Sequence, residues 1–215
     1  GLPIYIDGEL GPDNDRIGMA LLKYFEAEFP DMKPGRILDM GCTVGNSTLP
    51  WAEAFPDAEV HAIDVAAPCL RYGHARAELA GVPVHFSQRN AECTGFDAES
   101  FDVVLSHIVI HETSKPALRN IIAESYRLLK PGGVMLHLDV PRGSGPFDQF
   151  MSQWEVYNNN EVFASHLTDI DLAALAADCG FESDKVSMVG VGPYTGINHA
   201  YNDHGFKWPT LLGTK

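Results

Sequence analysis

The chain has 215 residues, of which 45% are hydrophobic and 20% are charged, a composition typical of a globular protein. That length predicts one domain whose core needs neither disulfides nor a structural metal. With 15 Lys and Arg against 29 Asp and Glu, the net charge is −14, which argues against partners such as nucleic acid or an anionic membrane surface.

The chain lacks targeting and cross-linking signals. No apolar run approaches the roughly 18 residues that span a bilayer, and the first residues do not form a secretory signal. The four cysteines, Cys42, Cys69, Cys93 and Cys179, are scattered without a CxxC pair. We therefore expect reduced thiols and a cytoplasmic protein.

Short β-rich runs alternate with helical stretches along the first two thirds of the chain. A capping cluster at 13–15 precedes helical spacing of apolar residues up to Phe29. The predicted strands are dense in Val, Ile and Leu, as in a parallel sheet buried on both faces: 36–40, 59–64, 84–87, 101–106 and 134–140. The predicted helices between them are 48–55, 68–80 and 116–130. This alternation predicts a doubly wound α/β domain.

The pattern changes after residue 140. A Gly/Pro-rich linker at 141–146 leads into an aromatic and amide-rich stretch at 147–166, which we interpret as an insertion over the sheet edge. A last helix at 171–179 and two strands at 185–191 and 206–213 follow, with a loop at 193–205 between the strands. We expect an N-terminal helix or lid at 1–33 and a main domain at 34–215, with the insertion at about 141–170.

The central motif is ILDMGCTVGNST at 37–48, where a buried strand, a glycine turn and a helix follow one another. Gly41 and Gly45 allow a ligand to approach the backbone closely, and the helix start offers free N–H groups. The dinucleotide pattern GxGxxG fails, because Thr43 and Asn46 stand at its other glycine positions. A glycine turn alone is therefore weak evidence for any particular ligand.

An acidic residue makes the signal more specific. Asp64 closes the next strand, about 20 positions after Gly45, where an acid can accept hydrogen bonds from both hydroxyls of a ribose. The two features together indicate a cofactor that contains a nucleoside and does not need a pyrophosphate.

In order along the chain, these motifs resemble those of class I S-adenosylmethionine-dependent methyltransferases. Residues 39–45 match the first motif of that family, acid-x-Gly-x-Gly-x-Gly, except that Thr43 replaces the middle glycine. Asp64 matches the acid that follows the second strand in that family. Residues 88–92 resemble the family's adenine-contacting motif, 101–106 its fourth-strand motif, and 128–133 the turn before its fifth strand. The resemblance implies a Rossmann-like seven-stranded sheet with helices on both faces, and S-adenosyl-L-methionine as the cofactor.

The resemblance also implies which residues contact the cofactor. Asp64 would hold the ribose, Val65 would lie against the adenine, and Asn90 and Ala91 would face its amino edge. The whole implied set is Asp39, Gly41, Cys42, Gly45, Asp64, Val65, Asn90, Ala91 and Ser106. Two alternatives stay open: the acids could merely cap helices or turns, and Asn90 could be an ordinary turn residue. Thr43 could crowd the methionine end or donate a hydrogen bond to it.

Two histidines follow the fourth strand, at the sheet edge where ligands bind in open α/β folds. His111 and His107 are therefore the candidate catalytic bases, because an imidazole titrates near neutral pH. Glu112 could assist His111 as an adjacent carboxylate. The alternative is that His111 serves packing or capping only. Asp139 could join a metal site, but the two histidines straddle a strand end and we predict no metal.

The insertion is the candidate substrate pocket, through Trp154, Tyr157 and Asn158, because aromatic walls with a few polar groups suit small ligands. Alternatively, these aromatics only fasten the insertion to the domain. We expect O- or C-methylation of an aromatic, quinol-like or secondary-metabolite acceptor, with a homodimer possible. Two other functions stay open: a non-catalytic cofactor sensor or interaction domain, and a nicotinamide-dependent oxidoreductase, against which the failed glycine pattern argues.

Overall fold

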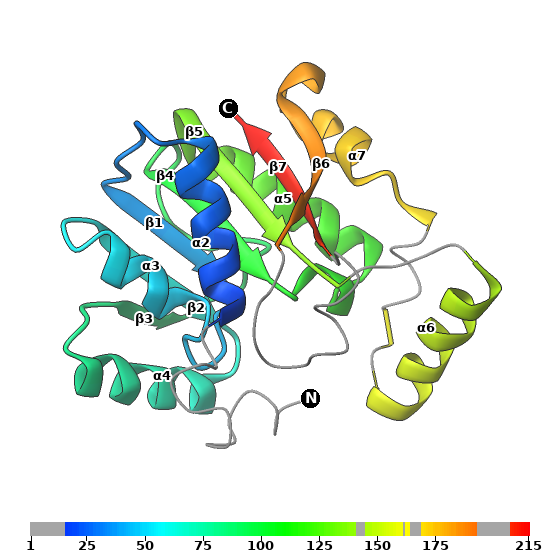
Figure 1. Ribbon diagram of the computed structural model, residues 1–215, viewed down its shortest axis with the longest axis horizontal. Coiled ribbons are helices and arrows are strands. Elements are labelled where there is room, and N and C mark those ends of the chain that lie inside the picture. Colours follow the sequence, from blue (N-terminus) through cyan, green and yellow to red (C-terminus); the bar gives the residue numbers. More distant parts are fainter. Residues whose placement is uncertain (1–15, 141–144, 161, 164–168, 193–206) are drawn as a thin grey trace.

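The computed structural model describes residues 16–140, 145–160, 162–163, 169–192 and 207–215, and its centre is one seven-stranded sheet (Figure 1). The strand order is β3-β2-β1-β4-β5-β7-β6. The first five strands in the chain pair in parallel, and β7 pairs antiparallel to both β5 and β6. The strands are β1 Arg36–Met40, β2 Glu59–Asp64, β3 His85–Gln88, β4 Phe101–His107, β5 Leu129–Leu138, β6 Val186–Val191 and β7 Trp208–Thr214.

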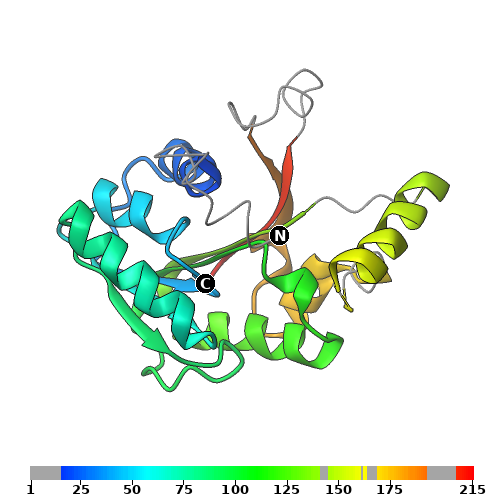
Figure 2. The ribbon, with the colours of Figure 1, turned by 90° about the horizontal axis from the view of Figure 1, so that it is seen from below.

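Helices cover both faces of this sheet, as Figure 2 shows, so the predicted doubly wound, Rossmann-like fold is confirmed. They are α2 Arg16–Glu28, α3 Thr48–Ala54, α4 Ala67–Ala80, α5 Lys115–Leu128 and α7 Leu172–Asp178, and a further helix is α6 Pro146–Asn159. Side chains alternate between two buried clusters along each strand. On β4, Val103 and Leu105 pack in the cluster of α2 and α3, whereas Val104 packs in the cluster of α5 and α7.

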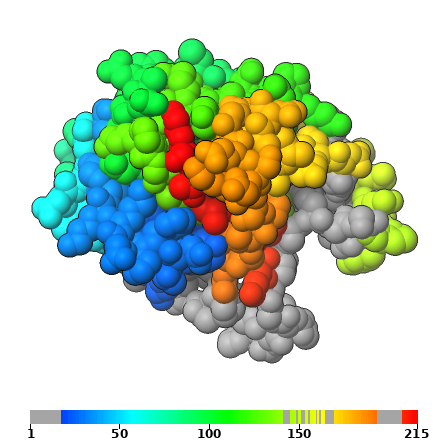
Figure 3. All heavy atoms as spheres, turned by 90° about the horizontal axis from the view of Figure 1, so that it is seen from above, coloured from blue at the N-terminus to red at the C-terminus, as the bar shows by residue number. Residues whose placement is uncertain are grey.

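Helix α2 packs tightly on the start of α3. Leu21 and Phe25 are fully buried, and the Phe25 and Trp51 rings lie 5.0 Å apart. A Cβ added to Gly18 would meet the Asn46 carbonyl oxygen at 2.8 Å, so the helix backbone sits directly on the glycine turn. Figure 3 shows the blue segment of α2 beside the orange and red strands β6 and β7. Helix α2 therefore packs against the domain, while a lid formed by residues 1–33 stays a prediction.

The largest deviation from the predicted strands is at β5, which starts at Leu129 instead of residue 134. The Pro-Gly-Gly segment is part of β5 because its backbone is hydrogen-bonded to the residue that follows β7. The Gly132 N–H donates to the Lys215 carbonyl oxygen, and the Lys215 N–H donates to the Gly133 carbonyl oxygen. The predicted insertion contains helix α6, which lies apart from the sheet at one end of the molecule in both ribbon views. The predicted loop at 193–205 falls outside the described residues.

Across the described helices, none combines the length and the apolar character that crossing a bilayer requires.

Candidate active site

The glycine turn after β1 has the backbone shape that a close ligand approach needs. Gly41 and Gly45 have φ values of +73° and +83°, a region that favours glycine. The N–H groups of Gly41 and Cys42 donate to the Ile63 carbonyl oxygen at 2.8 and 3.0 Å, which ties the turn to the end of β2. A Cβ on Gly41 would lie 2.6 Å from a methyl carbon of Val109. Only glycine therefore fits at this position.

Thr43, which stands at the position of the family's middle glycine, has a left-handed backbone with φ of +47°. A β-branched residue in that conformation is strained. The Thr43 side chain is exposed, so it does not fill the inside of the turn. Its N–H donates to Asp64 Oδ2 at 2.9 Å, and this bond links the turn to the acid of β2.

The glycine turn at 41–45 and the end of β2 lie side by side and together form a cradle. Asp64 and its neighbours are the second half of this cradle. Besides Thr43, Asp64 accepts the Ala66 N–H on Oδ1 at 2.7 Å, so each carboxylate oxygen keeps a second lone pair for a ribose hydroxyl. Val65 is 66% exposed and offers an apolar surface beside the acid. Asn90 is exposed and accepts the Glu92 N–H, which is the turn geometry of the alternative interpretation. Contacts of Val65, Asn90 and the half-buried Ala91 with adenine stay predictions.

Asp39 is buried beneath the turn and only half satisfied. Its Oδ2 accepts the hydroxyls of Ser47 and Thr48, both at 2.6 Å, and so holds the start of α3. Its Oδ1 is buried and has no hydrogen-bond partner among the described residues. Burial, with a smaller contribution from the negative charge of Asp64, raises the pKa of Asp39 to about 7. A cationic ligand above the turn would favour the ionised form.

The cradle fits S-adenosylmethionine in charge. Asp39 has an unsatisfied carboxylate oxygen and Asp64 has free acceptor positions, while Gly41 is partly exposed and Gly45 is buried. Cys42 is buried, and burial holds the pKa of its thiol well above the usual range, so only its backbone is suited to contact a ligand.

Ser106 belongs to a group of buried, hydrogen-bonded polar side chains on the face of β4 that α5 covers. Its Oγ lies 2.7 Å from Nδ1 of His137, whose Nε2 lies 3.1 Å from Ser125 Oγ. Burial lowers the pKa of His137 to about 4, against a raising effect from Asp139. The Ser106 side chain is thus committed to His137, and any contact with the cofactor would use its backbone. The sequence analysis missed His137, which stands within an apolar strand.

His111 forms a close pair with Asp139. The imidazole Nδ1 lies 2.7 Å from Asp139 Oδ1, and the His111 N–H donates to Oδ2 at 3.1 Å. Both side chains are buried. The adjacent Glu112 is more distant, with Oε1 3.9 Å from Nε2, so Asp139 is the carboxylate that orients the ring. Within the described chain, no group of three or more His, Cys, Asp or Glu side chains could hold a metal.

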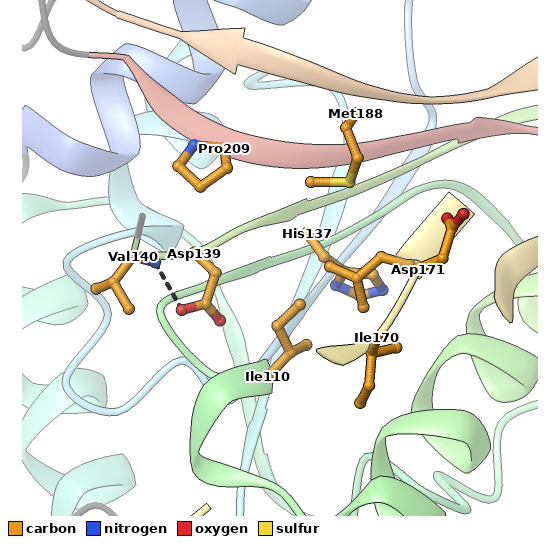
Figure 4. Close-up of a pocket in the computed structure, with 9 residues that line it drawn as sticks. Ile110, His137, Asp139, Val140, Ile170, Asp171, Met188 and Pro209 are labelled. Carbon is orange, nitrogen blue, oxygen red and sulfur yellow. Dashed lines mark hydrogen bonds between the residues drawn. The ribbon is translucent and has the colours of Figure 1, made fainter. Parts of the chain in front are cut away.

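Asp139 also lines a cavity of about 220 Å³ at the carboxyl end of β5 (Figure 4). Most of the wall is apolar, and it comes from five places in the fold. The residues are Ile110, His137, Asp139, Val140, Ile170, Asp171, Leu172, Met188 and Pro209. Asp139, the partner of His111, therefore lines a space that could take a small apolar group, whereas His111 is not among the described lining residues.

His107 has a different environment. Both of its ring nitrogens are buried, and neither has a hydrogen-bond partner among the described residues. Burial, with a smaller effect from His137, lowers the pKa of His107 to about 3. His107 is therefore neutral at physiological pH and is poorly suited to take up a proton.

The structure places Trp154, Tyr157 and Asn158 on α6. Trp154 is 46% and Tyr157 is 88% exposed, and Asn158 donates to the Trp154 carbonyl oxygen within the helix. The described lining of the cavity includes none of the three. Their role in substrate binding stays a prediction.

Comparison with known proteins adds an independent line of argument. A family model described as a methyltransferase domain matches residues 37–133. A malonyl-[acyl-carrier protein] O-methyltransferase of Salmonella typhimurium is 29% identical over 133 residues, which cover 62% of this chain and 49% of that protein. An uncharacterized methyltransferase of Synechocystis is 30% identical over 156 residues, or 70% of this chain and 68% of the relative.

A solved structure has the same fold. The SAM-dependent methyltransferase from Aquifex aeolicus matches with a TM-score of 0.62 at 19% identity, over 94% of this chain and 93% of the other. The present chain spans only about half the length of the Salmonella relative.

Proposed function

The chain belongs to the class I S-adenosylmethionine-dependent methyltransferases, and we propose that it transfers a methyl group to a hydroxyl oxygen of a small aromatic or quinol-like acceptor. The observation that carries the choice of oxygen is the buried His111–Asp139 pair beside the cavity. A hydroxyl must lose its proton to become a methyl ether, whereas many other acceptors need only alignment. The relative from Salmonella is also named as an O-methyltransferase.

S-adenosylmethionine, when bound, supplies an activated methyl group on a positively charged sulfur. The contribution of the chain is to hold both reactants in line, which is worth about 7–11 kcal/mol of the barrier when the geometry is good. Asp64 would hold the ribose through its free lone pairs, and Asp39 would face the cationic end. The exposed backbone at Gly41 would let the ligand lie close to β1.

Asp139 determines which nitrogen of His111 can act as a base. Because Nδ1 lies 2.7 Å from Asp139 Oδ1, a ring that carries its proton on Nδ1 would donate to Asp139, and Nε2 would then be the nitrogen that acts as the base. Nε2 would accept the proton of the acceptor hydroxyl as its oxygen attacks the methyl group. The Asp139 carboxylate would then stabilise the imidazolium that forms. A positioned base of this kind contributes about 10²–10⁴-fold in rate.

Two measurements test this proposal in turn. Titration calorimetry should show binding of S-adenosylmethionine and of its demethylated product to the purified protein. A panel of phenols and catechols should then yield product, detected as S-adenosylhomocysteine release, whereas the matching aryl methyl ethers should not. Cofactor binding without turnover on any hydroxylated compound would favour the sensor function instead, and no cofactor binding would refute the proposal.

A further inference from the structure

Helix α4 carries an arginine whose side chain reaches the glycine turn. Arg76 is half-buried, and its Nη1 donates to the Val44 carbonyl oxygen at 2.8 Å and to Oδ1 of Asn46. Both acceptors belong to residues 44–46, which are the second half of the turn and its continuation. Hydrogen bonds from a charged donor are roughly twice as strong as those between neutral groups. One side chain of α4 therefore holds two positions of the turn.

The two halves of the turn are fastened to different parts of the fold. The first half is tied to the end of β2 by the backbone N–H groups at 41–43. The second half is tied to α4 by Arg76. Three of the five residues at 41–45 have a positive φ, and one of them is the β-branched Thr43. Local preference does not favour this backbone, so its shape depends on bonds to the surrounding elements.

Two glycines let helices α2 and α4 lie directly against the second half of the turn. A Cβ on Gly73 of α4 would lie 3.1 Å from the Val44 carbonyl carbon. A Cβ on Gly18 of α2 would lie 2.8 Å from the Asn46 carbonyl oxygen. Glycine inside a helix lowers stability relative to alanine, and here it allows the close contact. The turn thus lies between two helix backbones, and the bonds of Arg76 fix its position there.

The position of this half of the turn also determines the surroundings of the buried acid. The two residues after Asn46 donate their hydroxyls to Asp39 Oδ2, at 2.6 Å each. Asp39 Oδ1 has no hydrogen-bond partner among the described residues. A displacement of Asn46 would move both hydroxyls and so reorient the carboxyl that would face the cationic end of the cofactor.

We propose that Arg76 is a positioning residue for the cofactor, which holds residues 44–46 in the conformation that binds S-adenosylmethionine. It acts through the turn and not by contact with either reactant, and the inference rests on the proposed function. Without the guanidinium, the turn would also populate other conformations. The apparent affinity falls by the fraction of molecules that keep the competent one, so a fraction of about one tenth weakens binding about tenfold.

Titration calorimetry with S-adenosylhomocysteine is the first test. Arg76→Met keeps a long apolar stem but loses both donors, so the affinity should fall about tenfold. Arg76→Lys keeps a positive charge with three donors and should recover part of this loss. Equal affinities for Arg76→Met and the wild type would overturn the proposal. A lysine variant as weak as the methionine variant would do the same, because the loss would then come from packing and not from hydrogen bonds.

Lys130→Met is the matched control for general loss of stability. Lys130 Nζ lies 2.8 Å from Asp102 Oδ1. Asp102 Oδ2 accepts the N–H groups of Gly35 and Arg36, at the end of β1 that lies opposite to the turn. Both methionine variants should lower the melting temperature, but Lys130→Met should keep the wild-type affinity. An equal loss of affinity in the two variants would show that binding only follows stability, and would refute the role of Arg76.

Hydrogen exchange, measured by mass spectrometry on the ligand-free protein, reports on the turn itself. The amides of a peptide that covers 41–49 should exchange about tenfold faster in Arg76→Met than in the wild type, and at the wild-type rate in Lys130→Met. Unchanged exchange in Arg76→Met would mean that the turn keeps its shape without the arginine, against the proposal. A wild type that fails to bind S-adenosylhomocysteine refutes the proposed function itself, whereas the exchange result concerns Arg76 alone.

Discussion

The half-satisfied carboxyl of Asp39 predicts that cofactor affinity depends on pH. In the free protein, burial raises the pKa of Asp39 to about 7, so the group is mostly protonated at pH 6. A bound ligand with an ammonium group favours the ionised form, because the unpartnered Oδ1 then faces a positive charge. Binding below pH 7 must therefore release the proton first.

The size of the effect follows from the pKa. If the complex keeps Asp39 ionised throughout, affinity should be about tenfold weaker at pH 6 and about 100-fold weaker at pH 5 than at pH 8. Titration calorimetry with S-adenosylhomocysteine measures this directly. Repeating the titration at pH 6 in buffers of different ionisation enthalpy should show release of about one proton.

Asp39→Asn is the matched control. The amide oxygen can still accept from Ser47 and Thr48, but the group no longer titrates. Its affinity should be weak and independent of pH. A wild-type affinity that stays constant from pH 5 to pH 8, or a variant that keeps the wild-type slope, would refute the reasoning.

The Asp39 carboxyl also makes the stability of the ligand-free protein depend on pH, in the direction opposite to its effect on cofactor affinity. An acid with a raised pKa holds its proton more tightly in the folded state than in the unfolded chain. The ligand-free protein should therefore lose stability as the pH rises from about 4 to about 7. Melting temperatures of the wild type and Asp39→Asn at pH 5 and pH 8 measure this, and the variant should lose less.

Four further substitutions, one of them a control, give defined outcomes. Asp139→Asn should lower kcat for methyl transfer about 10–100-fold with little change in cofactor affinity, because a charge-assisted bond to His111 is worth about 1.5–3 kcal/mol. Asp171→Asn, at an exposed residue of the same cavity, should leave kcat unchanged, and equal kcat values for the two variants would contradict the base role. Thr43→Gly should raise the free energy of unfolding by about 0.5–1 kcal/mol in urea denaturation, since relief of left-handed strain exceeds the entropy cost of glycine. Gly41→Ala should abolish cofactor binding in calorimetry and destabilise the fold by about 1–3 kcal/mol, because its Cβ would lie 2.6 Å from a valine methyl carbon; unchanged binding would show that the ligand does not use this turn.

The cofactor half of the site could be predicted because its signals are local. The turn from Asp39 to Gly45 and the acid Asp64 follow strands whose carboxyl ends meet in any parallel sheet. Most of the seven strands could be predicted for a similar reason, since they are short apolar runs between clear breaks, although β3 (His85–Gln88) is largely polar.

The acceptor half depends on contacts that sequence spacing does not encode. His111 and Asp139 are 28 positions apart, and the sequence offers only the adjacent Glu112 as a carboxylate that could assist His111. Ser106 lies next to His107 in the chain, but alternation sends the two side chains to opposite faces of the sheet. Whether an imidazole is satisfied, as in His137, or orphaned, as in His107, depends on which side chains surround it after folding.

The position of β7 has a consequence for the order in which the sheet is assembled. This strand follows all the other strands in the chain, yet it lies inside the sheet, between β5 and β6. Its Pro209 carbonyl oxygen accepts the N–H of Asp139 and its ring closes one wall of the cavity. The strands of the proposed cradle all precede β7 in the chain, whereas the cavity lined by Asp139 and Pro209 is complete only once β7 has joined the sheet.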